Sequence, residues 1–284
     1  MPAVNTKSDK MLKRAFFYVG MALLLFICLF PFFIMLMTAF KSSEEAIATN
    51  PTFFPEQWTL RHFVDIFNPD IFPYLTYLQN SLMVSLTASL ISVGIAIFGA
   101  YALSRLNFRW RIQINASFYM VYMFSGILLI VPLFKLISGF GLYDTRTSLI
   151  IIMIVQTLPT AILMLNSYFE TIPKDLEEAA KIDGLNRVKV IFYIIIPLSF
   201  AGIVSVFVYC FMVAWNDFLF ASIFFSSSEN FTLPVGLYSL FSTPDYVWGR
   251  MMAASIVTAI PVVILYAISE SLIKGNTTDG GVKG

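Results

Sequence analysis

Long apolar runs constrain the fold of this chain more than any other feature of its sequence. A helix that crosses a bilayer needs about 20 mostly apolar residues. Of the 284 residues, 58% are hydrophobic and 12% are charged, whereas a soluble domain carries about 25% charged residues. We therefore predict an all-α, polytopic membrane protein with six transmembrane helices within residues 16–273. The predicted spans are 16–40, 80–103, 116–134, 147–168, 200–225 and 251–270.

Lysine and arginine are distributed unequally between the two sides of such a membrane protein. Most of the 18 Lys and Arg residues fall in residues 1–15, 104–115, 169–199 and 274–284. These segments share one side if six helices span the bilayer. Because cytoplasmic loops carry an excess of Lys and Arg, this side is predicted to be cytoplasmic. The N-terminal segment 1–15 and the C-terminal tail 274–284 are then both inside the cell. The net charge of +1 gives no indication of a nucleic-acid partner.

The cytoplasmic segment 170–199 reads as two short helices separated by a glycine turn. Asp175, with Glu178 three residues later, predicts a capping box at the start of the first helix. Ala179–Ala180 are expected to form a flat patch of small side chains. Asp183–Gly184 signals a turn in which the glycine takes the left-handed conformation that ends a helix. The segment is predicted to be a compact docking element, although an ordinary amphipathic surface loop would explain each feature singly.

The spacing of the residues in this segment carries a family resemblance. E-A-A, three further residues, Gly, and a downstream Pro-Leu are matched by Glu178, Ala179, Ala180, Gly184, Pro197 and Leu198. This pattern resembles the EAA loop of ABC-importer permeases, and the chain is identified as a member of the carbohydrate branch, the maltose-type second permease. Further stretches that resemble this branch are Tyr101–Arg105, 119–129, Trp215–Asp217, 230–234 and Gly280–Gly284.

The resemblance implies an ABC type I importer permease fold in the cytoplasmic (inner) membrane. It implies as partners a homologous second permease, two ATP-binding-cassette ATPase subunits, an extracytoplasmic sugar-binding protein and membrane lipid. In that family the loop fits a cleft on the ATPase. This assigns the coupling contact to Glu178, Ala179, Ala180, Asp183, Gly184 and Arg187. The tail residues expected to reach the interface between the ATPase subunits, unless they are a frayed terminus, are Gly280, Gly281, Val282, Lys283 and Gly284.

Sequence motifs for common kinds of catalysis are missing from the chain. It has no Gly-x-x-x-x-Gly-Lys-Ser/Thr phosphate loop, so a partner subunit is expected to bind ATP and magnesium and to hydrolyse ATP. We expect no catalytic residue, no metal and no cofactor in this chain, and we expect the single histidine, His62, at the surface. A secondary sugar carrier driven by an ion gradient is the alternative function. A membrane scaffold that transports nothing would leave the EAA spacing unexplained.

Polar residues within the predicted spans are candidates for the translocation pathway. Trp215 can stack on a sugar ring, while Asn216 and Asp217 can bond its hydroxyl groups. A structural Asp217 that caps or pairs near the outer end of its span is an equal alternative. Tyr122 and Gln156 are the other candidates, although membrane glutamines often bond a neighbouring helix.

Overall fold

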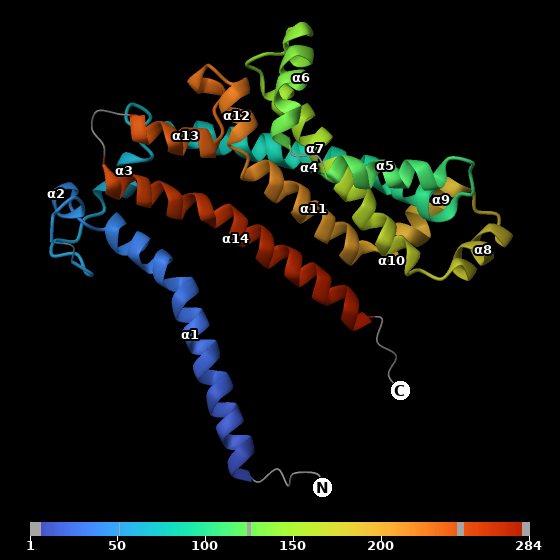
Figure 1. Ribbon diagram of the computed structural model, residues 1–284, viewed down its shortest axis with the longest axis horizontal. Coiled ribbons are helices and arrows are strands. Elements are labelled where there is room, and N and C mark those ends of the chain that lie inside the picture. The colour runs from blue at the N-terminus through green and yellow to red at the C-terminus, as the bar shows by residue number, and fades with distance from the viewer. Residues whose placement is uncertain (1–6, 51, 124–125, 243–246, 280–284) are drawn as a thin grey trace. The chain divides into compact units, whose positions relative to one another are not determined.

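The computed structural model describes residues 7–50, 52–123, 126–242 and 247–279, and every regular element in this part is a helix (Figure 1). The chain divides into two compact units. The first comprises Met1–Pro73 and Leu240–Val257, and the second comprises Tyr74–Ser239 and Thr258–Gly284. The last helix, α14 (Trp248–Asp279), contributes to both units.

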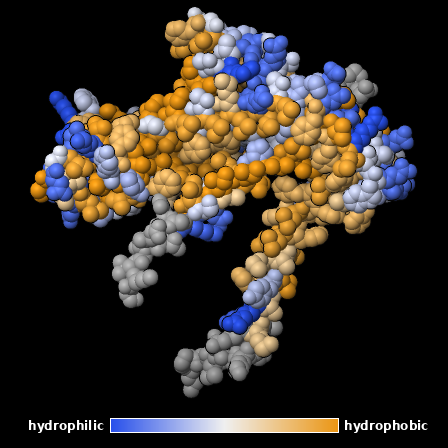
Figure 2. Space-filling model, turned by 180° about the vertical axis from the view of Figure 1, so that it is seen from behind, coloured by the Kyte–Doolittle hydropathy of each residue, from blue (hydrophilic) through white to orange (hydrophobic). Residues whose placement is uncertain are grey.

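The first unit contains one long apolar helix and several short ones. The short elements are α2 (Ser43–Ala46), α3 (Arg61–Asp65) and η3 (Leu240–Ser242). The long helix, α1 (Lys7–Ala39), is as apolar as a membrane span, and 0% of its most apolar window is buried within the chain. Figure 2 shows hydrophobic residues over most of its length. An apolar helix left uncovered by its own chain is suited to lipid or to a partner helix.

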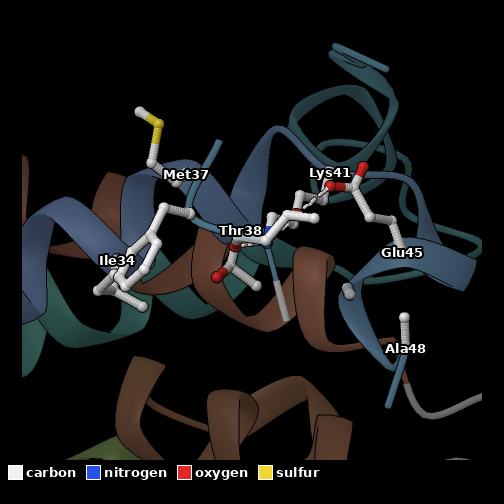
Figure 3. Close-up of a pocket in the computed structure, with 9 residues that line it drawn as sticks. Ile34, Met37, Thr38, Lys41, Glu45 and Ala48 are labelled. Carbon is white, nitrogen blue, oxygen red and sulfur yellow. Dashed lines mark hydrogen bonds and ion pairs between the residues drawn. The ribbon is translucent and has the colours of Figure 1, made fainter. Parts of the chain in front are cut away.

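A polar network holds the loop that follows α1, beside a cavity of about 260 Å³ (Figure 3). Lys41 is only 6% exposed; its Nζ donates to the carbonyl of Thr52 and lies 4.0 Å from Glu45 Oε1. The Thr52 hydroxyl donates to the same carboxylate oxygen at 2.6 Å. This hydrogen bond holds the pKa of Glu45 below its usual value. The buried lysine is thus compensated within its own loop, as a buried charge requires.

From the sequence we expected His62, which lies on α3, at the surface. That expectation is wrong. The His62 side chain is 2% exposed, and its Nε2 lies 3.0 Å from the carbonyl oxygen of Lys41. The ring occupies space that Gly249 leaves open, since a Cβ there would come within 2.3 Å of the imidazole. Burial lowers the pKa of His62, because the charged form loses its hydration.

The second unit is built around α4 (Tyr74–Arg105), α7 (Arg146–Glu170) and α11 (Phe200–Trp215), which lie side by side (Figure 1). Small residues on α4 let these helices approach closely, as in other membrane helix pairs. The Ser92 hydroxyl lies 2.8 Å from that of Thr157 on α7. Small buried residues recur along α4 at Ser81, Ser85, Ala88, Ser92, Ala96 and Ala100.

The remaining helices of this unit are shorter. They are α5 (Arg111–Met123), α6 (Gly126–Gly139), α8 (Lys174–Ile182), α9 (Arg187–Val190), a π-helical turn η1 (Ile191–Ile195), α10 (Ile196–Leu198), α12 (Leu219–Phe224), η2 (Ser228–Asn230) and α13 (Leu233–Ser239). Figure 1 shows α8 and α9 near one end of α4, while α12 and α13 lie toward its other end.

Among the described residues, four helices are long and apolar enough to cross a membrane. They are Lys13–Ala39, Tyr74–Arg105, Arg146–Glu170 and Trp248–Lys274. Two further pairs, α5 with α6 and Arg187–Leu198 with α11, pass together but are bent, the second by 84°. The count reaches six if each bent pair is one span. The predicted window 200–225 is not one helix, because α11 ends at Trp215 and α12 begins at Leu219. The domain boundaries and the topology remain predictions.

One aspartate holds the segment after α12 in place. Asp144 accepts hydrogen bonds from the backbone amides and hydroxyls of Ser226 and Ser227, and its carbonyl accepts from Asn230 Nδ2 at 2.6 Å. From α4, Asn80 Nδ2 donates to the carbonyls of Glu229 and Phe231 at 2.7 and 2.9 Å. We name Asp144 and residues 226–230 the aspartate clamp.

The clamp stabilises the ionised form of its aspartate. Partial burial works against the charge of Asp144, but hydrogen bonds from Ser227 and Ser226 outweigh it and hold the pKa below its usual range. The backbone of Asp144 has φ 58°, a left-handed conformation that aspartate tolerates better than most residues. A glycine at this position would keep the backbone but lose every contact of the carboxylate.

Candidate functional site

The first half of the candidate coupling segment is α8, and its start differs from the sequence prediction. The helix begins at Lys174, directly after Pro173, whose side chain makes no capping hydrogen bond. The predicted capping box of Asp175 and Glu178 is therefore wrong, because Asp175 already lies inside the first turn. In the first turn its negative charge still interacts favourably with the positive end of the helix dipole.

The end of α8 agrees with the sequence prediction. Gly184 has φ +86°, and its amide donates to the carbonyl of Lys181 at 3.0 Å. The next amide, of Leu185, donates to the carbonyl of Ala180 at 3.0 Å. This pair of bonds is a Schellman motif. A Cβ at Gly184 would meet nothing within 4 Å, so the glycine is needed for its backbone conformation and not for space. Asn186 then caps α9 by accepting from the Lys189 amide at 2.9 Å.

The two alanines of the motif point in different directions. Ala179 is exposed, whereas Ala180 is 6% exposed and belongs to the hydrophobic core that includes Tyr101 and Phe169. The predicted flat patch of both alanines is therefore wrong for Ala180, because a helix turns successive residues by 100°. The predicted coupling residues that are exposed are Glu178, Ala179, Asp183, Gly184 and Arg187.

A buried ion pair that we did not predict fixes α8 to the end of α4. Glu177 on α8 is 2% exposed, and one of its carboxylate oxygens accepts from Arg105 Nε. Its other oxygen accepts from the Tyr101 hydroxyl at 3.2 Å. Arg105 Nη2 also donates to the carbonyl of Ile172 at 2.8 Å, in the turn between α7 and α8. We name Arg105, Glu177 and Tyr101 the inner latch.

The sequence held one signal for this latch. Tyr101 and Arg105 are four residues apart, which places both on one face at the end of α4. The partner was harder to identify, since Glu177 and Glu178 are adjacent and chemically identical. Nothing in the local sequence says which of them faces α4.

The candidate pathway residues around the end of α11 each make a contact within their own chain, although only Trp215 is buried. Trp215 is 3% exposed and stacks on Phe211, with 5.4 Å between ring centroids and 19° between planes. Asp217 accepts from the amides of Phe220 at 3.4 Å and Ala221 at 3.0 Å, so it pairs with the first turn of α12, one position before the N-cap residue Phe218. Asn216 is exposed and donates to the carbonyl of Met212 at 2.9 Å. This geometry is that of the structural alternative for Asp217, and a pathway role remains a prediction.

The other predicted site residues are dispersed. Tyr122 is 63% exposed on α5. Gln156 on α7 is half-buried; its Nε2 is a buried atom without a hydrogen-bond partner, and it faces the position of Gly126. The predicted contact residues of the tail, Gly280 to Gly284, lie outside the described residues.

Three comparisons with known proteins bear on this geometry. Residues 92–275 match the family described as binding-protein-dependent transport system inner membrane component. Over 277 residues the chain is 66% identical to the inner membrane ABC transporter permease protein YcjP of Escherichia coli K12, with 98% of this chain and 99% of YcjP covered. It is 35% identical over 283 residues to the trehalose/maltose transport system permease protein MalG of Thermococcus litoralis, covering 97% and 99% of the two chains.

The fold is also found among solved structures. A chain of a bacterial ABC transporter involved in the import of the acidic polysaccharide alginate superposes with a TM-score of 0.79. The sequences are 20% identical, and the superposition covers 95% of this chain and 99% of that chain. A likeness at this identity shows that the two chains share one all-helical fold.

Proposed function

We propose that this chain, which belongs to the family of inner-membrane components of binding-protein-dependent transport systems, carries a carbohydrate or a glycoside across the membrane. Membership of the family confirms the resemblance predicted from the EAA spacing. The chain is an ABC-importer permease, a multi-pass inner-membrane protein with the all-helical fold of that class. Permease subunits of this kind are not ATPases and carry no cofactor, and they work within an importer complex.

The proposed mechanism is alternating access driven by partner subunits. Two ATPase subunits bind ATP and close, their movement reaches this chain through the segment 170–199, and the membrane helices rearrange to open outward. Hydrolysis then resets the complex. A homologous second permease completes the pathway, a binding protein delivers the sugar from outside, and lipid surrounds the assembly. The tail Gly280–Gly284 reaches toward the ATPase interface.

The observation that carries this proposal is the shape of the coupling segment. The Gly184 turn ends α8 with exposed Glu178 and Ala179, while Glu177 is held inward by Arg105. One face of α8 is thus open to a partner and the other is fixed to a membrane helix. The carbohydrate assignment draws on the 35% identical relative named for trehalose/maltose transport.

Transport by the reconstituted complex tests the proposal. The permease pair, ATPase and binding protein would be placed in proteoliposomes, with trehalose and maltose offered as sugars and methionine as the unrelated control. We expect uptake of a sugar that requires internal ATP and is absent for methionine. Uptake that persists without ATP and stops when an ion gradient is abolished would establish the secondary carrier instead. ATP-driven uptake of methionine alone would refute the carbohydrate assignment.

A further inference from the structure

We propose that the inner latch makes α8 and α4 move as one rigid body, so that Glu177 transmits the movement that Glu178 receives from the ATPase. This inference rests on the proposed function, since it concerns how that importer couples ATP hydrolysis to transport. It assigns different roles to two adjacent glutamates. Arg105 and Glu177 are positioning residues here, because they act through α4 and α8 and not on the transported molecule.

The connections of α8 to the rest of the unit show why the latch matters. Along the chain, α8 leads through the Gly184 turn to α9, η1 and α10, and only then to α11. Across the fold, α8 buries only Glu177 and Ala180. Because glycine adopts many backbone conformations, a glycine turn transmits a movement of α8 poorly. The latch is a direct connection, because it joins α8 to the last turn of α4 by charged hydrogen bonds.

The hydrogen bonds of the latch fix the orientation of α8 relative to α4, which apolar contacts alone would not do. Arg105 and Glu177 side chains are 5% and 3% exposed, and apolar residues of similar size often stabilise such a site equally well. What apolar residues lack is direction. Both oxygens of Glu177 are bonded, one to Arg105 and one to Tyr101, and the same guanidinium holds the Ile172 carbonyl. Three chain segments are therefore fixed in one relative orientation.

The helix at the other end of the latch extends through the unit. α4 packs against both α7 and α11, and its buried face holds residues from Tyr74 to Ser104. A change in the orientation of α8 would therefore reach the helices that surround α4, because packed interiors transmit strain.

A matched pair of substitutions separates the two roles. Glu177→Gln and Glu178→Gln are the same chemical change at adjacent positions, one buried and one exposed. In the assembled complex we expect Glu178→Gln to reduce recovery of the ATPase with the permease while the surviving complexes keep their ratio of sugar transported to ATP hydrolysed. We expect Glu177→Gln to retain the ATPase but to lower that ratio by about tenfold. Equal ratios in the wild type and Glu177→Gln would overturn the proposal.

An apolar pair guards against loss of folding in the single variant. Arg105→Met combined with Glu177→Leu removes both buried charges and fills the site. We expect this double variant to yield a recoverable complex that still hydrolyses ATP but transports with a reduced ratio. Wild-type coupling in the double variant would show that packing alone suffices and that the charged latch has no role.

A distance measurement tests the rigid body without any substrate. Lys174 on α8 and Leu90 on α4 are both exposed, so spin labels can be attached to cysteines there in a Cys28→Ser background. We expect one narrow distance distribution that is unchanged between the ATP-bound and nucleotide-free complex, and a broader one in Glu177→Gln. A wild-type distance that shifts by several ångströms with nucleotide would overturn the proposal. If only the sugar assignment is wrong, the transport assay fails while this distance result stands.

Discussion

The inner latch and the aspartate clamp both join distant segments of the chain, but they do so with different kinds of contact. Each ties together segments that lie far apart in the sequence: Arg105 and Glu177 at one junction, and Asp144 and Ser226–Asn230 at the other. The latch uses one ion pair that is almost fully buried. The clamp is partly open to water and divides its contacts among backbone amides, hydroxyls and an amide side chain.

The difference determines how each junction fails. A buried charge that loses its partner keeps the full cost of its lost hydration, so the latch should fail as a unit. The groups in the clamp can bond water when one contact is lost, so its failure should be gradual. A concentrated junction suits a part that must transmit an orientation, whereas a distributed one suits a part that must only remain in place.

The strongest test of this contrast is removal of the arginine. Arg105→Ala leaves Glu177 buried and without its ion-pair partner, which typically costs about 3–5 kcal/mol. We expect a large drop in the apparent unfolding temperature of the purified complex. The control is Arg109→Ala, four residues later and exposed, which should change that temperature little. A small effect at Arg105 would remove the distinction between the two junctions.

A substitution at the turn beyond the latch should have an intermediate effect. In Gly184→Val a β-branched residue is forced to φ +86°, at a cost of about 1–3 kcal/mol. We expect insertion of the chain into the membrane to remain normal while ATPase recovery and uptake fall. Gly94→Val is the control, because a Cβ there also meets nothing within 4 Å but the residue is helical. Normal uptake by Gly184→Val would contradict the need for a left-handed residue.

Loss of the clamp should cost less than loss of the latch. Asp144→Ala removes the acceptor for Ser226 and Ser227, but these groups can then bond water. We expect a loss of about 1–2 kcal/mol, which corresponds to one or two exposed hydrogen bonds. Faster proteolysis within 225–233 would report it, with Asp70→Ala, the same truncation at an exposed aspartate outside the clamp, as the control. A loss as large as that of Arg105→Ala would show that the clamp is not distributed.

The smallest effect should appear with pH. The pKa of Asp144 is lower in the folded chain than in the unfolded chain, so its contribution is complete above about pH 4, the ordinary value for aspartate. It should decline as pH falls further toward the depressed folded pKa, because the unfolded state binds the proton first. Protease resistance of residues 225–233 should therefore weaken below about pH 4, and Asp144→Asn should lack that component. Unchanged pH dependence in Asp144→Asn would exclude the charge as the cause.

These junctions also show which parts of the molecule local sequence could predict. The left-handed Gly184 was predictable, because its cause is the conformational freedom of glycine and needs no distant partner. The roles of Glu177 and Glu178 were not, since they depend on which face of α8 meets α4. The Asp144 contacts join residues more than 80 positions apart and left no local pattern. Asp175 misled us because Pro173 starts the helix earlier than a capping box would.

The bend between α10 and α11 has a consequence for the far end of α11. The second half of the coupling segment is joined to α11 at Ser199, where the helix axis turns by 84°. With 16 residues, α11 acts as a lever arm roughly 24 Å long, and a tilt of about 5° at its base would displace its tip by about 2 Å. The tip is Trp215, the last residue of α11, just before the break that separates α11 from α12. Under the proposed function, a small rotation of the segment 170–199 would therefore move Trp215 by a distance comparable to the hydrogen-to-acceptor distance in a hydrogen bond.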